Sequence, residues 1–443
     1  DHPAALHLLG AIAHQMGKND LAVDLITRAV AIKPNYAEAH NNLGNALRSQ
    51  GRLDEAIRCY RAALGADPDY ADARGNLLLM EQYRPGHTAD TLYKLHCEWD
   101  EHHGRMFRAQ WPEHRNIPEP ARRLRIGFVS SDPGRHPVGY FAVGLLENLP
   151  KTEIETFVYA DRRTDDLMER IKDATDIWRS ARGVSDEELT KTILDDEIDI
   201  LIDLTGHTAK NRLLVFVRKP APLQVTWAGY VGTTGLSTID YLLSDMHSTH
   251  VDEEEFHSEK VLRMPNGSVC YDPPDYAPDV GPLPCKQNGF VTFGAFSNPS
   301  KLNAEVLSLW ARILNGVANS RLLTKSRGID SVSNVERLTT MFEAEGIDRS
   351  RLDFEGRSPH ADLLARYNDV DIALDPFPYS GGLTTLEALW MGVPVVTVPE
   401  EAFASRLSLS HLSTIGLPEL VARDQDNYLE LVVELANNTD RLA

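Results

Sequence analysis

The same six-position pattern occurs twice, 34 residues apart, at the start of this 443-residue chain. If Pro3 and Ala37 open two units, positions 7, 8, 20, 27 and 32 hold Leu, Gly, Ala, Ala and Pro in both, and position 24 is apolar. The glycines fall where helices must touch closely, and the prolines stop the second helix. Such a unit buries its apolar face only against a neighbour, so the chain must begin as a stack. The residues are Leu9, Gly10, Ala22, Ile26, Ala29 and Pro34, then Leu43, Gly44, Ala56, Tyr60, Ala63 and Pro68.

This pattern resembles the tetratricopeptide repeat, in which each unit is a pair of antiparallel helices. A generic pair of helical hairpins is the alternative, and the matches in both registers favour the repeat. A third unit begins at Ala71 and its pattern fades after Tyr83. Because repeat arrays need several units and a cap, we expect further repeats upstream of residue 1. The concave surface of such an array binds extended peptides, which predicts a polypeptide partner.

Composition and charge exclude several classes of protein. The chain has 45 Lys and Arg against 65 Asp and Glu, a net charge of −20, which repels nucleic acid and anionic membranes. An anionic ligand must therefore be bound by local groups. No apolar run has the length of a membrane-spanning helix, and the first residues do not form a signal peptide. The four cysteines lack the spacing of a metal site, so we expect reduced thiols in a cytoplasm.

Two series of strand-length apolar runs follow a proline-containing linker, and both alternate with helical patterns. This alternation is typical of parallel sheets covered by helices. A segment with five prolines between 273 and 284 divides the two series. We predict repeats over 1–85, linking helices over 86–120, and two Rossmann-like domains over 121–280 and 281–443. The runs are 126–129, 156–159, 198–204, 224–227 and 241–243, then 290–293, 321–324, 351–354, 371–374 and 395–398.

Ligands of such folds bind at the carboxyl ends of the strands, so the loops there are candidate sites. A cleft between the two domains is the expected place. The loops after the first, third, fourth and sixth of these runs are small and polar. They cover 130–137, 205–210, 229–235 and 295–301.

The loop before residue 384 is the most informative of the strand-end loops. Gly381 and Gly382 lack a Cβ and let the backbone approach a ligand. Thr384 and Thr385 then open a helix, whose free amides and dipole favour a pyrophosphate. One turn later, Glu387 is placed to reach a ribose diol. An ordinary strand-to-helix turn is the alternative, because glycine-rich loops are common.

Two acidic or histidine-rich segments are better explained by structure than by a metal. His96, His102 and His103 lie together on a predicted helix beside Trp99, and we interpret them as a packing or solvated face. The pair Asp369 and Asp371 stands at a strand start rather than at a strand end, which favours a structural role.

Together these residues resemble one family, the protein O-linked N-acetylglucosamine transferases and the Spindly-type O-fucosyltransferases, and a bacterial member in particular. Its segments here are Ser130–Asp132 with His136–Pro137, Pro220–Tyr230, Lys301 before the helix containing Trp310, and Gly381–Glu387. The resemblance implies an all-α repeat superhelix followed by a GT-B fold, two Rossmann-like domains facing across a cleft. It also implies an inverting glycosyltransferase that needs no metal.

The resemblance assigns roles to several residues. Lys301 is expected to neutralise the leaving diphosphate, and His136 or His207 to accept or orient the acceptor hydroxyl. The implied donor-binding set is Asn298, Lys301, Gly381, Gly382, Leu383, Thr384, Thr385 and Glu387.

The donor remains open between UDP-N-acetylglucosamine and GDP-fucose. The segment 206–208 reads Gly-His-Thr, which resembles the Spindly branch rather than the animal enzymes. The segment 382–384 lacks the histidine that animal enzymes place before their threonine pair. A third interpretation is a repeat-based scaffold without activity. The chain also ends soon after a helical pattern, so a final helix that returns to the first sheet domain is expected beyond Ala443.

Overall fold

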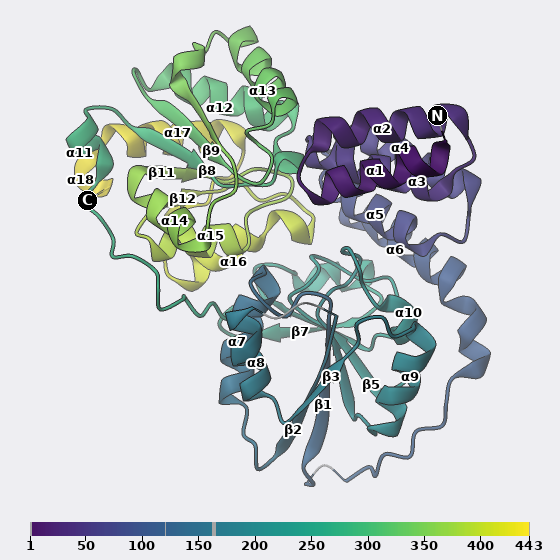
Figure 1. Cartoon of the computed structure of the whole chain (residues 1–443). Coiled ribbons are helices and arrows are strands. Elements are labelled where there is room, and N and C mark those ends of the chain that lie inside the picture. The colour runs from purple at the N-terminus through teal and green to yellow at the C-terminus, as the bar shows by residue number, and fades with distance from the viewer. Residues whose placement is uncertain (1, 120, 162–164, 443) are drawn as a thin grey trace.

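The computed structural model describes residues 2–119, 121–161 and 165–442. The amino-terminal part is a stack of antiparallel helices, as the 34-residue period predicts. Figure 1 shows this stack, in purple, beside both sheet domains. The helices are α1 (Pro3–Gln15), α2 (Asn19–Ile32), α3 (Ala37–Ser49), α4 (Leu53–Ala66), α5 (Ala71–Glu81) and the linking helix α6 (Ala89–His103), followed by the 3-10 helix η1 (Arg105–Gln110).

The repeated glycine is explained by the residue that faces it in each helix pair. A Cβ on Gly10 would lie 2.4 Å from Cγ1 of Ile26, and a Cβ on Gly44 would lie 2.6 Å from Cε1 of Tyr60. Ile26 and Tyr60 occupy the same position of the repeat and are fully buried. Position 8 must therefore be glycine because position 24 fills the space over it.

The first sheet domain is a parallel sheet of seven strands in the order β3-β2-β1-β4-β5-β6-β7. Helices α7 (Pro137–Asn148) and α8 (Asp166–Ala174) pack on one face, and α9 (Asp186–Asp195) and α10 (Leu213–Phe216) on the other. The strands are β1 (Leu124–Ser130), β2 (Ile154–Ala160), β3 (Ile177–Ser180), β4 (Ile200–Asp203), β5 (Leu223–Thr226), β6 (Tyr241–Asp245) and β7 (Lys260–Met264).

The two edge strands of this sheet are absent from the sequence prediction. Strand β3 is half exposed or exposed along its length, and β7 alternates between exposed and half-buried residues. Neither presents a continuous apolar run, which is the signal that identifies central parallel strands. The five predicted strands are all confirmed, and they are the buried ones.

The second sheet domain is a parallel sheet of five strands in the order β10-β9-β8-β11-β12. All five predicted strands are confirmed, although β8 begins two residues later than its apolar run and β12 is shorter. The strands are β8 (Thr292–Ala295), β9 (Arg321–Lys325), β10 (Leu352–Glu355), β11 (Ile372–Leu374) and β12 (Val395–Val396). The main helices are α11 (Pro284–Asn288), α12 (Ala304–Gly316), α13 (Val332–Ala344), α14 (His360–Arg366), α15 (Leu383–Trp390), α16 (Leu407–Thr414), α17 (Gln425–Asn437) and α18 (Thr439–Leu442).

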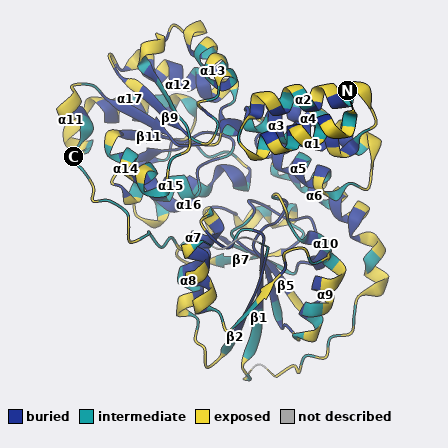
Figure 2. Ribbon diagram, viewed as in Figure 1, coloured by how far each residue is buried: buried dark blue, intermediate teal, exposed yellow. Residues whose placement is uncertain are grey.

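Buried side chains join the repeats to both sheet domains. One apolar cluster contains Leu79, Met80 and Tyr83 from the repeats, Tyr230 from the first sheet domain and Tyr379 from the second. In Figure 2 dark blue is concentrated in the central strands of the two sheets, and the outward faces of the helices are yellow. The three parts therefore meet at one buried junction. Within the described ranges, no helix is both long and apolar enough to cross a bilayer.

The close contact at Gly44 gives a direct test of the repeat packing. We expect Gly44→Ala to destabilise the repeats by about 1–3 kcal/mol, because the new methyl group overlaps the buried Tyr60 ring. Gly65→Ala is the matched control, since Gly65 also lies in a repeat helix and nothing is within 4 Å of its Cβ position. Thermal unfolding followed by circular dichroism measures both. Equal midpoints for the two variants would contradict the packing argument.

Candidate active site

The loop between β11 and α15 is held by Asp375, the first residue after the strand. One carboxylate oxygen of Asp375 accepts a hydrogen bond from the Gly381 amide at 2.6 Å, and the other accepts one from the Thr397 hydroxyl at 2.7 Å. Asp375 is 4% exposed, and burial raises its pKa. This carboxylate therefore fixes the path of the loop. Asp375 is not among the residues predicted from the sequence, although its position directly after a buried strand is a usable signal.

The two glycines of the loop have different reasons to be glycine. A Cβ on Gly381 would lie 2.3 Å from the Thr385 hydroxyl oxygen and 2.9 Å from the Asp375 carboxylate, so packing excludes it. Gly382 has its nearest neighbour, Leu407, at 3.6 Å from the Cβ position, which is ordinary contact. Only Gly382, at the N-cap of α15, has room beside it for another molecule's atoms.

The two threonines also differ. Thr385 is buried, and its hydroxyl forms a 2.8 Å hydrogen bond with the Ser408 hydroxyl. Thr384 is half-buried, and its carbonyl accepts a 3.0 Å hydrogen bond from Tyr367. In the part of the chain that the structure describes, the Thr384 hydroxyl has no hydrogen-bond partner, so it is the one available to a ligand. Thr385 supports the loop from inside.

Lys301 reaches this loop from the 3-10 helix η3 (Pro299–Lys301). Its Nζ donates to the Ser380 carbonyl at 2.6 Å and lies 4.3 Å from the centre of the Tyr379 ring. Burial lowers the pKa of Lys301 to about 8, against the opposing field of Asp375. Asn298 is exposed and caps η3, with its side chain accepting from the Ser300 amide at 3.0 Å.

Glu387 lies one turn into α15 and is only 3% exposed. Its carboxylate bonds to Nε2 of His360 at 2.8 Å, and burial raises its pKa. The other nitrogen of His360 is 3.0 Å from the Tyr140 hydroxyl and 2.8 Å from the Tyr276 hydroxyl. Tyr140 belongs to α7 of the first sheet domain, so this polar chain crosses between the domains. His360 follows the loop after β10, a strand-end loop that the sequence analysis did not inspect.

The two candidate histidines of the first sheet domain occupy different surroundings. His136 is half-buried at the N-cap of α7, the helix that carries Tyr140. His207 is 1% exposed, and its Nε2 lies 2.7 Å from the Thr234 carbonyl. Its ring centre is 5.2 Å from His96 and 5.4 Å from Trp99, both on α6. Burial lowers the pKa of His207 to about 3. The structure thus places His136 at a helix start and His207 against the linking helix.

The remaining polar candidates are structural. His96 and His103 are buried on α6, and His96 is 2.7 Å from the Tyr230 hydroxyl. Asp371 accepts hydrogen bonds from the amides of Cys285 and Thr292, both at 2.8 Å. Among the described residues, no group of three or more His, Cys, Asp or Glu side chains could hold a metal ion.

Polar contacts close the two sheet domains over the loop. Arg406, just before α16, forms two hydrogen bonds of 2.6 and 2.8 Å with the carboxylate of Glu253 in the first sheet domain. The Ser410 hydroxyl donates to Asp245 at 2.8 Å. Beside them, Leu383 packs against the apolar core of the first sheet domain.

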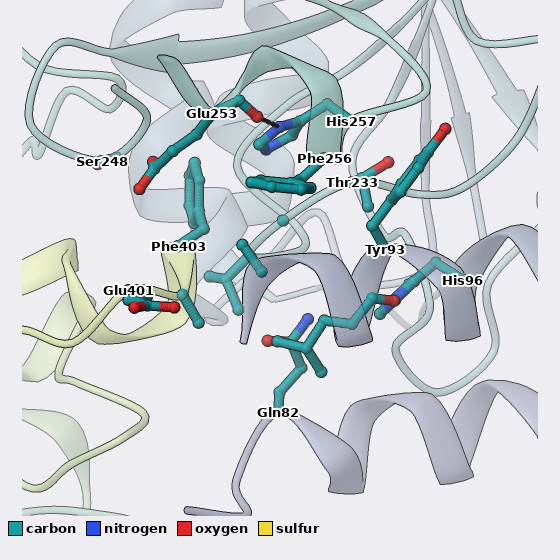
Figure 3. A pocket seen from close by; sticks show the side chains of 15 residues that line it. Gln82, Tyr93, His96, Thr233, Ser248, Glu253, Phe256, His257, Glu401 and Phe403 are labelled. Atoms are coloured by element: carbon teal, nitrogen blue, oxygen red, sulfur yellow. Dashed lines mark hydrogen bonds between the residues drawn. The ribbon is translucent and has the colours of Figure 1, made fainter. Parts of the chain in front are cut away.

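Two small cavities lie along this boundary. One of about 50 Å³ adjoins Gly382 and is lined by apolar residues of both sheet domains, among them Phe141, Val231 and Leu407. The other, of about 30 Å³, lies where all three parts of the chain meet. Figure 3 shows its side chains converging from the repeats and α6 (Gln82, Tyr93, His96), from the first sheet domain (Thr233, Ser248, Glu253, Phe256, His257) and from the second (Glu401, Phe403).

Two Rossmann-like parallel-sheet domains that face each other define the GT-B class of fold. Comparison with known proteins identifies the family. Glycosyl transferase family 41 matches residues 103–274 and 285–443, and tetratricopeptide repeats match 3–36 and 37–70, the registers predicted from the sequence. The chain belongs to glycosyl transferase family 41.

Individual relatives agree with this assignment. The "probable UDP-N-acetylglucosamine–peptide N-acetylglucosaminyltransferase SPINDLY" of Solanum lycopersicum is 38% identical over 376 residues, 83% of this chain and 40% of its own length. The corresponding SEC protein of Arabidopsis thaliana is 30% identical over 72% of this chain and 34% of its own length. This chain thus spans well under half of these curated relatives.

A solved structure is similar over nearly the whole chain. It is a lysine-to-methionine mutant of the Thermobaculum terrenum O-GlcNAc transferase, with 37% sequence identity and a TM-score of 0.94. It covers 99% of this chain, and the match covers 84% of that protein's chain.

The contact between Arg406 and Glu253 can be tested by a double-mutant cycle. We expect Arg406→Ala to destabilise the closed domains by about 3 kcal/mol, because the guanidinium is 8% exposed and its loss leaves Glu253 largely buried without its cation. Arg312 and Asp426 form a control pair at 2.8 Å whose side chains are 47% and 82% exposed, so their cycle should give about 0–1 kcal/mol. Thermal unfolding measures both. A coupling energy between Arg406 and Glu253 no larger than that of the control pair would contradict a stabilising role for this contact.

Proposed function

We propose that this protein is an inverting, metal-independent protein O-glycosyltransferase. It transfers a sugar from a nucleotide diphosphate to Ser or Thr hydroxyl groups of a polypeptide. The observation that carries the proposal is the Lys301 ammonium, 2.6 Å from the Ser380 carbonyl and directly beside the glycine loop and the start of α15. A diphosphate that leaves a sugar there would meet a cation and the positive end of a helix.

The reaction needs a cation and a base from the protein. The bond between the anomeric carbon and the diphosphate oxygen breaks, and a bond from that carbon to the acceptor oxygen forms on the opposite face. Lys301 neutralises the charge that develops on the leaving diphosphate, which is the role a metal ion would otherwise have. The acceptor hydroxyl gives its proton to a base.

The donor would lie across the second sheet domain. Gly382, the amides at the start of α15 and the Thr384 hydroxyl are available to the phosphates, and Glu387 with His360 to the ribose. Of the two histidines, His136 is the better base, because an imidazole whose pKa is about 3, like that of His207, accepts a proton poorly near neutral pH.

UDP-N-acetylglucosamine is the first candidate donor, since the names of the SPINDLY and SEC relatives include it. GDP-fucose is the second, supported by the Spindly-like segments at 206–208 and 382–384. The repeats favour a polypeptide as the acceptor. A cytoplasmic location agrees with the four free cysteines.

Calorimetric titration with UDP and with GDP distinguishes the two donors. We expect UDP to bind at least about tenfold more tightly than GDP. Turnover of the matching nucleotide sugar on a peptide library is then measured. Tighter binding of GDP would favour GDP-fucose as the donor. Peptide binding without any release of nucleotide would support an inactive scaffold.

Replacement of Lys301 tests the proposed chemistry. We expect Lys301→Met to reduce kcat by roughly 100- to 1,000-fold, because the leaving charge loses its cation in a site from which water is largely excluded. Affinity for the intact nucleotide sugar, in which the leaving charge has not yet developed, should fall less than kcat. Full turnover in this variant would refute the role of Lys301.

The pH dependence of turnover tests the same group without a mutation. Burial lowers the pKa of Lys301 to about 8, so its charge is present below that pH and is lost as the pH rises through it. The kcat/KM for the nucleotide sugar reports groups of the free enzyme, so we expect it to fall above about pH 8. In Lys301→Arg, whose guanidinium stays charged, the residual kcat/KM should lack this decline. A wild-type kcat/KM that stays constant to about pH 10, near the ordinary lysine pKa, would contradict the assignment.

A further inference from the structure

Three residues from distant parts of the chain form a column at the candidate active site. Tyr83, which follows α5 in the repeats, stacks on Tyr379 of the glycine loop with ring centres 4.5 Å apart and planes 13° apart. The Tyr379 ring in turn faces the Lys301 ammonium at 4.3 Å. A repeat side chain is therefore one ring away from the group proposed to receive the leaving charge.

The repeats also contact Lys301 through its own segment. The Ser300 hydroxyl, one residue before Lys301, donates to the Arg48 carbonyl in α3 at 2.9 Å. The turn after α3 lies so close that a Cβ on Gly51 would be 2.7 Å from the Pro299 carbonyl oxygen. The repeats therefore contact both segments that position the ammonium, the 3-10 helix η3 and the Tyr379 ring.

The ammonium is positioned by two neighbouring groups of one loop. Its direct contacts are the Ser380 carbonyl and the Tyr379 ring, which are adjacent residues of one loop. Tyr83 is 8% exposed and belongs to the buried cluster that also contains Tyr230. If the Tyr83 ring is removed, the Tyr379 ring loses its stacking partner and has space to turn away from Lys301.

We propose that Tyr83 is a positioning residue for Lys301, and that the repeats are thereby a structural part of the site that receives the leaving diphosphate. The inference rests on the proposed function, because it gives Lys301 its role.

The test compares Tyr83→Leu with Tyr83→Phe in the full chain. Tyr83→Leu should reduce kcat by roughly 3- to 30-fold, the range expected when a cation–aromatic contact is lost. Tyr83→Phe keeps a flat ring and should restore kcat to within about twofold of wild type. The KM for the nucleotide sugar should change less than kcat, because ground-state binding of the donor is not the affected step.

A second readout separates chemistry from peptide binding. Slow hydrolysis of the nucleotide sugar by water uses Lys301 but no peptide. It should fall in Tyr83→Leu by the same factor as peptide transfer. If only peptide transfer falls, Tyr83 acts through the acceptor and the inference is overturned.

Leu78→Ala is the matched control for stability. Leu78 lies in α5, is 3% exposed, and packs in the apolar cluster that contains Trp99 rather than in the cluster of Tyr83. It should lower the unfolding temperature without a comparable loss of kcat. If Tyr83→Leu does not fold, Tyr379→Leu breaks the same column from the loop side and should lower kcat likewise.

The outcomes distinguish the two levels of the proposal. Full turnover in Lys301→Met would refute the proposed role of the ammonium itself. Loss of turnover in Lys301→Met, combined with a kcat in Tyr83→Leu equal to that of Leu78→Ala, would overturn only the positioning role of Tyr83.

Discussion

The contact between the Lys301 ammonium and the loop after β11 is the interaction on which the candidate site depends. The chain carries a net charge of −20, so a diphosphate is repelled by the protein as a whole and must be attracted locally. Burial works against a charged lysine, and three groups of this one loop compensate: the Ser380 carbonyl, the Tyr379 ring and the Asp375 carboxylate. Asp375 also fixes the loop through the Gly381 amide. Asp375 therefore both fixes the loop conformation and helps to keep Lys301 charged.

Several of the contacts between the sheet domains near this loop are polar. Glu253 bonds to Arg406 and Asp245 to Ser410 across the boundary. Glu387 reaches Tyr140 through His360. Water can replace such hydrogen bonds at small net cost when the domains separate, which a purely apolar boundary would not permit. Such a boundary suits the proposed function, in which the site admits a large donor and releases a nucleotide.

The sequence predicts those features that depend on local pattern, and it fails where burial and long-range contact decide. The repeat register follows from spacing alone, and the contact of Gly44 with Tyr60 explains why. Central strands are found because both faces are buried, and the edge strands β3 and β7 are missed because they are partly exposed. The glycine loop, Lys301 and Glu387 are also predicted from local pattern, and the structure brings Lys301 into contact with that loop. His360 and the stacked pair Tyr83 and Tyr379 are not, because their partners come from elsewhere in the fold.

Residue type at a strand end is thus a necessary signal for function but not a sufficient one. His136 and His207 both follow strands of the same sheet, and pattern ranks them equally. Their surroundings do not: His207 is packed among His96, Trp99 and Tyr230, and burial lowers its pKa to about 3. The same division holds for Thr384 and Thr385 and for Gly382 and Gly381, where one member faces outward and the other supports the loop. In each pair we assign the proposed chemistry to the residue that packing leaves accessible, and only the folded chain determines which one that is.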